Sequence, residues 1–381
     1  MTGSNPVAPL LRPGDRGRAV VEIRHRLARL GLLLEGAPST DAYDEAVDHA
    51  VRAFQQERGL SVDGIIGPST YRMLEEAGWR LGDRVLTHVP GSLFSGDDVV
   101  ALQRRLLELG FQVGRVDGRF GHQTEQAVRD FQRNVGVPSD GTCGPATFKA
   151  LAQLAPLVSG GSPNAMRAEE RLRRAGPQLT GKVVVLDSAV GRIADAGLRA
   201  RADAITTDLA RRVEGRLVAT GVQAYLTNRG GAADIPETER AEFANRAGAN
   251  LCVSLEVDVS PNPDACGVSS YYYGSQAHDV VSSVGERFAG LVQREIVART
   301  DLADLRSHAK TWDLLRHTRM PAVRIDVGYL TNSGDAARLA DPAFRDVVAE
   351  AVVVAVQRVY LSPETDTKTG VLRFSELRAI R

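Results

Sequence analysis

Two stretches in the first third of the chain carry apolar side chains at the spacing of an amphipathic helix. The apolar positions are Val20, Ile23, Leu27 and Leu30 in the first stretch and Val99, Leu102, Leu106 and Leu109 in the second. Steps of three and four residues place such side chains on one face of a helix. A glycine follows each stretch, Gly31 and Gly110, where a helix is expected to end. Each stretch therefore predicts a helix, which a loop, a second helix and a turn into a third helix follow.

The second half of the chain has a different pattern, in which short apolar runs alternate with longer helical segments. The runs typical of buried strands are 182–187, 222–227, 251–257, 268–273 and 322–327. The segments with helical periodicity are 200–217, 237–246, 280–298 and 342–359. Alternation of this kind predicts an α/β domain with a central, mostly parallel sheet that helices cover. The whole chain is thus expected to be multidomain, with two small helical modules before this domain.

The first half contains an internal repeat. Phe54-Gln55, Asp63-Gly64 and Gly67-Pro68 with Thr70 recur at one constant offset as Phe131-Gln132, Asp140-Gly141 and Gly144-Pro145 with Thr147. The preceding helix recurs at a slightly larger offset, since Leu30-Gly31 becomes Leu109-Gly110. The two offsets differ by two residues, which is the size of an insertion or deletion that a surface loop tolerates.

Each copy resembles the three-helix peptidoglycan-binding module of cell-wall hydrolases. The second copy carries the pattern of that module almost fully, with Leu102-Gln103, Asp117, Phe120-Gly121, Thr124, Ala127-Val128 and Phe131-Gln132. The first copy departs from it at Tyr43-Asp44, where Phe-Gly is usual, and at Val47, where Thr is usual. Apolar, Gly and Pro positions of this kind are mainly core and turn formers. The resemblance therefore implies two such modules, at 10–80 and 88–155, more directly than it implies their ligand.

A segment rich in Pro, Gly and Ser, residues 156–163, follows the second module. These residue types interrupt helices, and we expect a linker over 156–179. The α/β domain is expected over 180–361. The remaining residues, 362–381, are expected to form a flexible tail.

The α/β segment resembles the zinc-dependent N-acetylmuramoyl-L-alanine amidases of the third amidase family. The resemblance rests on VVVLD at 183–187, AYLTN at 224–228, ERAEFANRAGANLCVSLEVD at 239–258 and LLRHTRMPAVRIDVGYLTN at 314–332. It implies an enzyme fold in which two histidines and a glutamate hold Zn²⁺ and a second glutamate acts as the general base. Such chemistry needs three protein ligands and an open fourth position on the metal.

The residues at those four positions depart from the family pattern. Val190 stands at the first histidine, Ala202 at the helix glutamate, Glu256 at the second histidine and Asp326 at the general base. Valine and alanine offer no lone pair, and aspartate is one methylene shorter than the glutamate whose geometry the chemistry demands. We therefore expect a degenerate amidase domain, a pseudoenzyme with no catalytic residues, no resident metal and no cofactor.

The surviving acids leave two alternatives open. Glu256, Asp258 and Asp326 are candidate ligand-binding residues, and carboxylates of this kind suit a hard cation such as Mg²⁺ or Mn²⁺. The same acids could form a solvated rim at the ends of two neighbouring strands. His308 and His317 flank the last strand, but neither occupies a ligand position of the family, and both are expected to be ordinary polar residues.

Composition narrows the possible partners and the compartment. Lys plus Arg and Asp plus Glu number 47 each, so that no net charge would attract nucleic acid. The stretch from Met1 to Arg18 lacks the basic and apolar regions of an export signal. Cys143, Cys252 and Cys266 are odd in number and widely spaced, which does not indicate a disulfide framework. We expect a cytoplasmic protein, associated with a membrane only through a partner.

The sequence thus predicts a regulator of peptidoglycan biosynthesis and not a hydrolase. Its ligands would be peptidoglycan precursors or muropeptide. Its protein partner would be a precursor-synthesis enzyme, with the enolpyruvyl transferase of the first committed step as first choice and the lipid-precursor flippase as second. An exported zinc amidase and a passive interaction module without a ligand are the alternatives.

The tail adds a candidate for regulation. Residues 362–370 are polar and contain Thr365, Thr367 and Thr369 among charged residues, and apolar positions resume over 371–380. A phosphate on threonine adds nearly two negative charges and acceptors that suit arginine. We expect a Ser/Thr protein kinase to modify one of these threonines and thereby to change partner choice.

Overall fold

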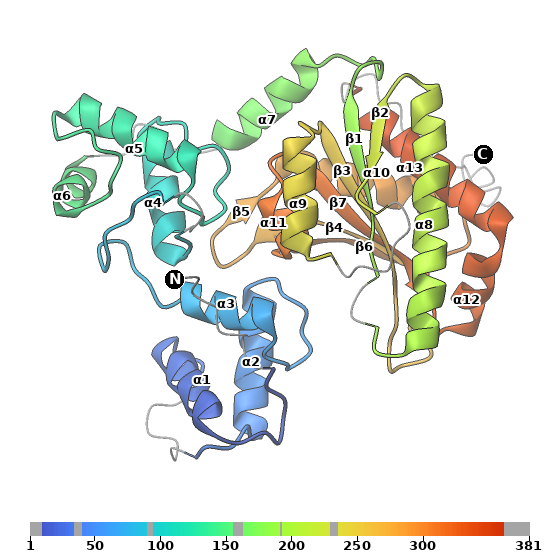
Figure 1. Ribbon diagram of the computed structural model, residues 1–381, viewed down its shortest axis with the longest axis horizontal. Helices are drawn as coiled ribbons and strands as arrows, with labels where there is room; N and C mark the ends of the chain where they lie inside the picture. The colour runs from blue at the N-terminus through green and yellow to red at the C-terminus, as the bar shows by residue number, and fades with distance from the viewer. Residues whose placement is uncertain are drawn as a thin grey trace, which may run out of the picture. The chain divides into compact units, whose positions relative to one another are not determined.

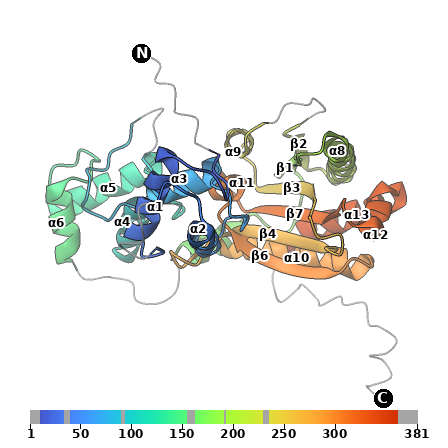
Figure 2. The same cartoon turned by 90° about the horizontal axis from the view of Figure 1, so that it is seen from below.

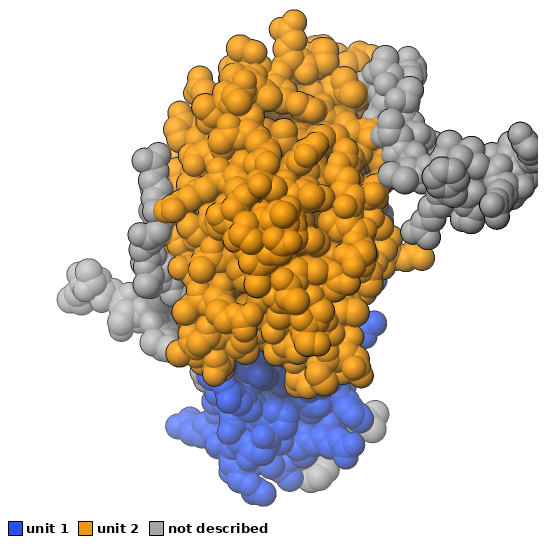
Figure 3. Space-filling view, turned by 90° about the vertical axis from the view of Figure 1, so that its right-hand side faces the viewer, with its two compact units in different colours: residues 1–164, 275–280 blue, residues 165–274, 281–381 orange. Residues whose placement is uncertain are grey.

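The computed structural model describes residues 10–33, 40–89, 94–154, 163–190, 193–228 and 235–361. The chain forms two compact units, which Figure 3 colours separately: residues 1–164 with 275–280, and residues 165–274 with 281–381. The first unit contains the two repeated modules, and the second contains the α/β domain. The expected tail, 362–381, with Thr365, Thr367 and Thr369, lies outside the described residues.

Each repeat forms a small three-helix module with its own apolar core. The first module contains α1 (Arg18–Arg29), α2 (Glu45–Glu57) and α3 (Pro68–Glu76), and the second contains α4 (Asp97–Glu108), α5 (His122–Val135) and α6 (Pro145–Gln153). Proline begins both third helices, where its missing N–H leaves no hydrogen bond unmade. The helical modules and the mostly parallel sheet described below confirm the predicted fold class.

Isolated antiparallel bridges recur in the two modules and fix the register of the repeat. Leu11 pairs with Ile66 in the first module, as Leu86 pairs with Cys143 in the second. Arg16 with Ala42 and Ser95 with Arg119 form a second matching set. The offset between Ala42 and Arg119 is two residues smaller than the offset between Arg16 and Ser95. The first module therefore has two more residues between its bridge partners, in the loop after its first helix.

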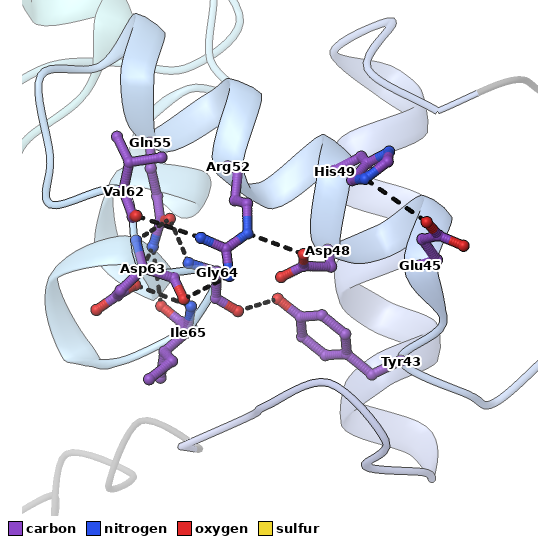
Figure 4. A network of polar contacts seen from close by, with 10 residues as sticks. All are labelled: Tyr43, Glu45, Asp48, His49, Arg52, Gln55, Val62, Asp63, Gly64 and Ile65. Atoms are coloured by element: carbon purple, nitrogen blue, oxygen red, sulfur yellow. Dashed lines mark hydrogen bonds and ion pairs between the residues drawn. The ribbon is translucent and has the colours of Figure 1, made fainter. Parts of the chain in front are cut away.

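A buried glutamine on α2 holds the turn that leads into α3 (Figure 4). The Gln55 amide nitrogen donates to Asp63 Oδ1 at 2.8 Å, Ile65 O at 3.0 Å and Thr70 Oγ1 at 3.2 Å. Its amide oxygen accepts from the backbone N–H groups of Asp63 at 3.1 Å and Gly64 at 2.9 Å. Gly64 has a φ of 69°, which favours glycine. The Gln and Asp-Gly elements of the sequence pattern are therefore parts of one structural network.

Gln132 repeats this network in the second module. Its amide nitrogen donates to Asp140 Oδ1 at 2.9 Å, Thr142 O at 2.9 Å and Thr147 Oγ1 at 3.0 Å. Its oxygen accepts from the Gly141 N–H at 2.9 Å. The repeated motif residues thus satisfy backbone groups that would otherwise be buried without partners.

The second module has another glutamine of the same kind on its first helix. Gln103 donates to Asp117 Oδ1 at 3.0 Å, Arg119 O at 3.1 Å and Thr124 Oγ1 at 3.1 Å, and it accepts from the Asp117 and Gly118 N–H groups at 3.1 and 2.9 Å. The residue is 1% exposed. These contacts explain why the sequence pattern contains the Gln of Leu-Gln, the Asp and the Thr.

Arg24 takes the place of Gln103 in the first module. Its guanidinium donates to Ala42 O at 3.2 Å, the counterpart of the Arg119 carbonyl, and to Asp44 Oδ2 at 2.8 Å. Asp44 also caps α2 by accepting from the Val47 N–H at 3.0 Å. The departures from the sequence pattern in this module are therefore compensated locally, by an arginine and an aspartate that act together.

The α/β domain is built on one mixed sheet of seven strands among the described residues. The strands are β1 (Val183–Ser188), β2 (Gln223–Leu226), β3 (Leu251–Asp258), β4 (Val268–Ser275), β5 (Val280–Val281), β6 (Asp304–Lys310) and β7 (Ala322–Tyr329). Their order is β2-β1-β3-β7-β4-β5, and β6 pairs with β4. The pairings β1–β2, β1–β3, β3–β7 and β4–β6 are parallel and β4–β7 is antiparallel, so the sheet is mostly parallel as predicted.

Helices cover both faces of this sheet (Figures 1 and 2). The long helices α8 (Ala196–Ala219), α10 (Ser283–Arg299) and α13 (Pro342–Val359) pack together over the apolar face, whose core includes Val253, Leu255 and Ile325. The helices α9 (Glu237–Arg246) and α11 (Asp313–His317) contact each other on the other side, and α11 also contacts β7. Because successive residues of a strand point to opposite faces, the polar residues of β3 and β7 face α9 and α11.

The sequence pattern predicted most of the helices and strands, including the four-residue β2. It did not anticipate β6, α11 or α12 (Ser333–Ala340), which are five to eight residues long. The range expected to be a linker, 156–179, contains helix α7 (Pro163–Arg174). The Pro, Gly and Ser residues that suggested the linker end where this helix begins, so the composition located a boundary and not the length of the connection.

We expect Gln103→Ala to lower the free energy of unfolding of the second module by about 2–4 kcal/mol, because the backbone N–H groups of Asp117 and Gly118 lose their buried acceptor. Gln126→Ala is the matched control, since Gln126 lies on the outer side of α5 and donates to the exposed Asp130. Urea unfolding followed by circular dichroism measures both changes. Equal effects of the two substitutions would contradict the structural role of the buried glutamine.

Candidate functional site

A group of buried charged residues lies on the face of the sheet toward α9 and α11. The central strands β1, β3 and β7 are parallel, and their registers pair Asp187 with Ser254 and Glu256 with Asp326. Arg324 lies two residues before Asp326 on the same strand and therefore on the same face. We call Asp187, Glu256, Arg324 and Asp326 the charged cluster. Glu256 and Asp326 are at two of the positions where the amidase resemblance places its chemistry.

Arg324 is the centre of the charged cluster. Its Nε donates to Asp326 Oδ1 at 2.8 Å and its Nη2 donates to Asp326 Oδ2 at 3.2 Å, so the pair is bidentate. The same Nη2 lies 3.0 Å from Glu256 Oε2. The guanidinium also lies over the ring of Trp312, 4.3 Å from its centroid. An internal cation thus sits between the two carboxylates that remain at the second-histidine and general-base positions.

A second ion pair anchors the end of β1. Asp187 is fully buried and accepts hydrogen bonds from Arg240 of α9, from Thr227, and from Ser254 Oγ at 2.7 Å. Arg240 is itself buried. Every buried charge needs a partner of opposite sign, and Arg240 supplies it for Asp187. The carboxylate of Asp187 is therefore already paired with residues of the same domain.

Glu256, Asp258 and Asp326 remain beside a single arginine, Arg324, and burial disfavours the charged forms of Glu256 and Asp258. Burial raises the pKa of Glu256 to about 8, Arg324 opposes this rise, and Asp326 adds to it. Glu256 Oε2 has no hydrogen bond despite its short ionic contact with Arg324. Burial and the nearby Asp326 also raise the pKa of Asp258. The bidentate contact of Arg324 with Asp326 has better geometry than its single contact with Glu256.

The positions of the other two expected ligands are apolar in the structure as well as in the sequence. Ala202 of α8 is fully buried within the hydrophobic core of the domain, and Val190 is half-buried and packs against the same core. Neither can donate to a metal. With Glu256 in contact with Arg324, the residues at these described positions do not fit the zinc ion that the family resemblance implies.

The three acids proposed as ligands for a hard cation are not brought together as a chelating set. Among the described residues, three His, Cys, Asp or Glu ligand atoms within 4.8 Å of one another occur elsewhere in the chain, and not at Glu256, Asp258 and Asp326. Asp258 accepts from the Val259 N–H at 2.8 Å. Burial, and then the positive charge of Arg324, lower the pKa of the nearby Lys310.

The two histidines beside the last strand have local contacts of their own. His308 lies exposed on β6, with Nε2 2.6 Å from Leu305 O. His317 lies at the end of α11, with Nε2 3.9 Å from Asp313 Oδ1. These contacts agree with their interpretation as ordinary polar residues.

Sequence reasoning identified Glu256, Asp258 and Asp326 but missed the cations that accompany them. The signal for Arg324 was present, because a residue two positions from Asp326 on a strand must share its face. The signal for Arg240 was not, since its partner Asp187 is 53 residues away in the chain and only the fold joins them.

Comparison with known proteins gives the relatives of each part. Residues 184–358 match the family model described as N-acetylmuramoyl-L-alanine amidase, and residues 16–74 and 95–151 match that of a peptidoglycan binding domain. The chain is 46% identical over 387 residues to the N-acetylmuramoyl-L-alanine amidase CwlM of Mycobacterium tuberculosis, covering 97% of this chain and 94% of that protein.

More distant relatives cover about half of the chain. The germination-specific N-acetylmuramoyl-L-alanine amidase of Bacillus subtilis is 26% identical over 201 residues, which cover 48% of this chain and 81% of that protein. The solved structure of the amidase AmiC2 of Nostoc punctiforme is 26% identical and covers 46% of this chain and 96% of that chain, with a TM-score of 0.40.

None of the described helices has the length and apolar character that crossing a membrane requires.

We expect Arg324→Leu to lower the free energy of unfolding of the α/β domain by about 3–5 kcal/mol, because Glu256 and Asp326 would then be buried without their cation. The matched control is Arg246→Leu, which removes an exposed pair with Glu242 on α9. Adding Glu256→Gln and Asp326→Asn to Arg324→Leu should recover most of the loss. A neutral effect of Arg324→Leu in urea unfolding would show that the guanidinium does not neutralise the cluster.

Proposed function

The chain belongs to the N-acetylmuramoyl-L-alanine amidase family, and from that premise we propose that it is a non-catalytic member that recognises peptidoglycan or its precursors and regulates their synthesis. The amidase-type domain would serve as a binding and regulatory platform. The two modules would supply recognition of the cell-wall ligand, which their family description supports.

One observation carries the proposal for the α/β domain: the guanidinium of Arg324 occupies the space between the carboxylates of Glu256 and Asp326. Metal-assisted hydrolysis requires a divalent cation with an open position and a free carboxylate to act as base. Here the carboxylate at the base position is engaged in both of its oxygens by Arg324. A positive charge fixed at this point also opposes the entry of a second cation.

The first unit offers a groove for an anionic ligand. Its volume is about 1130 Å³, and its lining includes Arg18, Arg29 and Arg72 together with the exposed ring of Trp79. Glutamates also line it, so its field is mixed and not uniformly basic. Arginine forks suit carboxylates, and an exposed aromatic ring suits the apolar face of a sugar or peptide. Muropeptides and nucleotide-linked precursors carry both kinds of group.

The regulatory part of the proposal concerns a protein partner. Precursor supply is most directly adjusted at the first committed step, enolpyruvyl transfer to UDP-N-acetylglucosamine, so the transferase is the first candidate and the lipid-precursor flippase the second. Phosphorylation of Thr365, Thr367 or Thr369 by a Ser/Thr kinase would switch the choice of partner. In the sequence these threonines follow α13, the last of the described helices.

We expect the purified chain to release no stem peptide from peptidoglycan at neutral pH, with or without added Zn²⁺. A zinc-dependent amidase of the family, assayed on the same peptidoglycan, is the positive control. Chromatography of the soluble products measures the release. Stem-peptide release by the wild-type chain that is abolished by Asp326→Asn would overturn the non-catalytic assignment and favour the zinc amidase.

We expect the kinase-phosphorylated chain to bind the purified enolpyruvyl transferase and change its rate, and the unphosphorylated chain to do neither. The variant with Thr365→Ala, Thr367→Ala and Thr369→Ala should behave as the unphosphorylated protein after kinase treatment, because it cannot accept the phosphate at those positions. Size-exclusion chromatography and a phosphate-release assay are the measurements. If no phosphorylation state binds the transferase or alters its rate, that enzyme is not the partner, and the flippase becomes the candidate to test.

A further inference from the structure

Three potential metal ligands converge on the second module, far in the sequence from the charged cluster. His88 Nδ1 lies 2.8 Å from Glu125 Oε2, and His122 Nδ1 lies 3.7 Å from the same oxygen. One ligand atom from each of the three residues can be chosen so that all lie within 4.8 Å of one another. We propose that His88, His122 and Glu125 form a site for Zn²⁺ with a fourth coordination position open to water or to a donor from a bound molecule.

The separations of the ligand atoms fit a tetrahedral ion. Zn–N bonds of about 2.0–2.1 Å place two ligand atoms about 3.3 Å apart around a tetrahedral centre. The observed 2.8 and 3.7 Å lie on either side of this distance. Small changes in side-chain torsions would therefore suffice. Two imidazoles and one carboxylate favour Zn²⁺ over Mg²⁺ or Ca²⁺, which prefer oxygen ligands alone.

The local fold positions two of the ligands on one helix. His122 and Glu125 are the first and fourth residues of α5, and residues three apart lie on the same face of a helix. The helix begins after Gly121 and is held by the core contacts of Val128 and Phe131. His122 is exposed and free to turn toward the ion, whereas Glu125 is half-buried.

The third ligand comes from the strand-like segment before the second module. Leu86 forms a bridge with Cys143, with backbone hydrogen bonds of 3.1 and 2.7 Å in the two directions. Thr87 Oγ1 lies 3.3 Å from Thr142 Oγ1. These contacts fix the chain immediately before His88, whose ring contacts Glu125. The ligands are thus held by two separate parts of the module, as a preorganised metal site requires.

Arg129 determines which oxygen of Glu125 is available. It donates to Glu125 Oε1 at 2.8 Å, and it also donates to Ser139 O at 3.0 Å. Oε2 is left for the two histidines. The contact with Arg129 thus fixes the orientation of the carboxylate. The carboxylate also offsets the positive end of α5, which would otherwise disfavour a cation.

The first module has the same ion pair but lacks the histidines. Asp48 and Arg52 are the counterparts of Glu125 and Arg129, and Figure 4 shows the contact between them. Arg52 Nε donates to Asp48 Oδ2 at 2.8 Å. Glu45 stands at the position of His122, and the nearby His49 lies 3.9 Å from Glu45 on the outer surface. The acid–arginine pair therefore belongs to the module fold, whereas the histidines are an addition to the second copy.

The test is Zn²⁺ binding by the full chain after removal of metal with a chelator, followed by isothermal titration calorimetry. We expect one Zn²⁺ per chain at this site and no binding of Mg²⁺. His122→Ala should weaken Zn²⁺ binding by at least about 100-fold, the upper end of the loss seen when only a supporting residue around a metal is changed. His122 is largely exposed, so this substitution leaves the fold intact. His88→Ala and Glu125→Gln should have similar effects.

The matched control is His49→Ala, which removes an exposed histidine from the equivalent helix of the first module and should leave Zn²⁺ affinity unchanged. A second readout is the melting temperature, which Zn²⁺ should raise in the wild-type chain and in His49→Ala but not in His122→Ala. Wild-type affinity in His122→Ala, or no Zn²⁺ binding by the wild-type chain at micromolar metal, overturns the proposal and leaves a simple His–Glu contact. Stem-peptide release that persists in His122→Ala would count against the proposed function and not against this site.

Discussion

A carboxylate inside a folded domain must be protonated, paired with a cation or bound to a metal, because an isolated buried charge is too costly to keep. The end of the central sheet places Glu256 and Asp326 opposite each other, both nearly without solvent contact. Arg324 meets this constraint from within the chain, through a bidentate pair with Asp326 and an ionic contact with Glu256. In a hydrolytic site a metal ion balances the charge of the buried carboxylates. Here the side chain of Arg324 balances it.

The presence of Arg324 where a metal ion is expected connects the two apolar ligand positions with the two charged ones. If Arg324 supplies the cation, ligands at Val190 and Ala202 are not needed, and both positions can join the hydrophobic core. The charged cluster then contributes to the stability of the domain, because its buried carboxylates are balanced from within the chain. The rings of Trp312 and Tyr271 lie 4.6 Å apart, and Trp312 also contacts the Arg324 guanidinium, so aromatic packing continues from the charged cluster toward α11.

The need of buried polar groups for partners also explains which parts of the modules could be predicted from the sequence. The pairs Gln55 with Asp63-Gly64 and Gln132 with Asp140-Gly141 recur in register, because each glutamine satisfies the turn that follows it at a fixed distance along the chain. Local networks of this kind leave a pattern that self-comparison can find. The longer helices and strands were predictable for a similar reason, since their periodicity lies within one continuous segment.

Contacts between distant segments leave no such pattern. Arg240 reaches Asp187 only through the packing of α9 on the sheet, and the periodicity of neither segment indicates the pair. His88 and His122 lie on separate segments of the second module, and neither belongs to the repeated motif. Because the first module carries the Asp48–Arg52 pair but has no histidine at the positions equivalent to His88 and His122, comparison of the two copies separates the inherited part of the site from the added part. Duplicated modules thus serve as internal references, in which a residue present in one copy alone is a candidate for function and a residue shared by both is a candidate for folding.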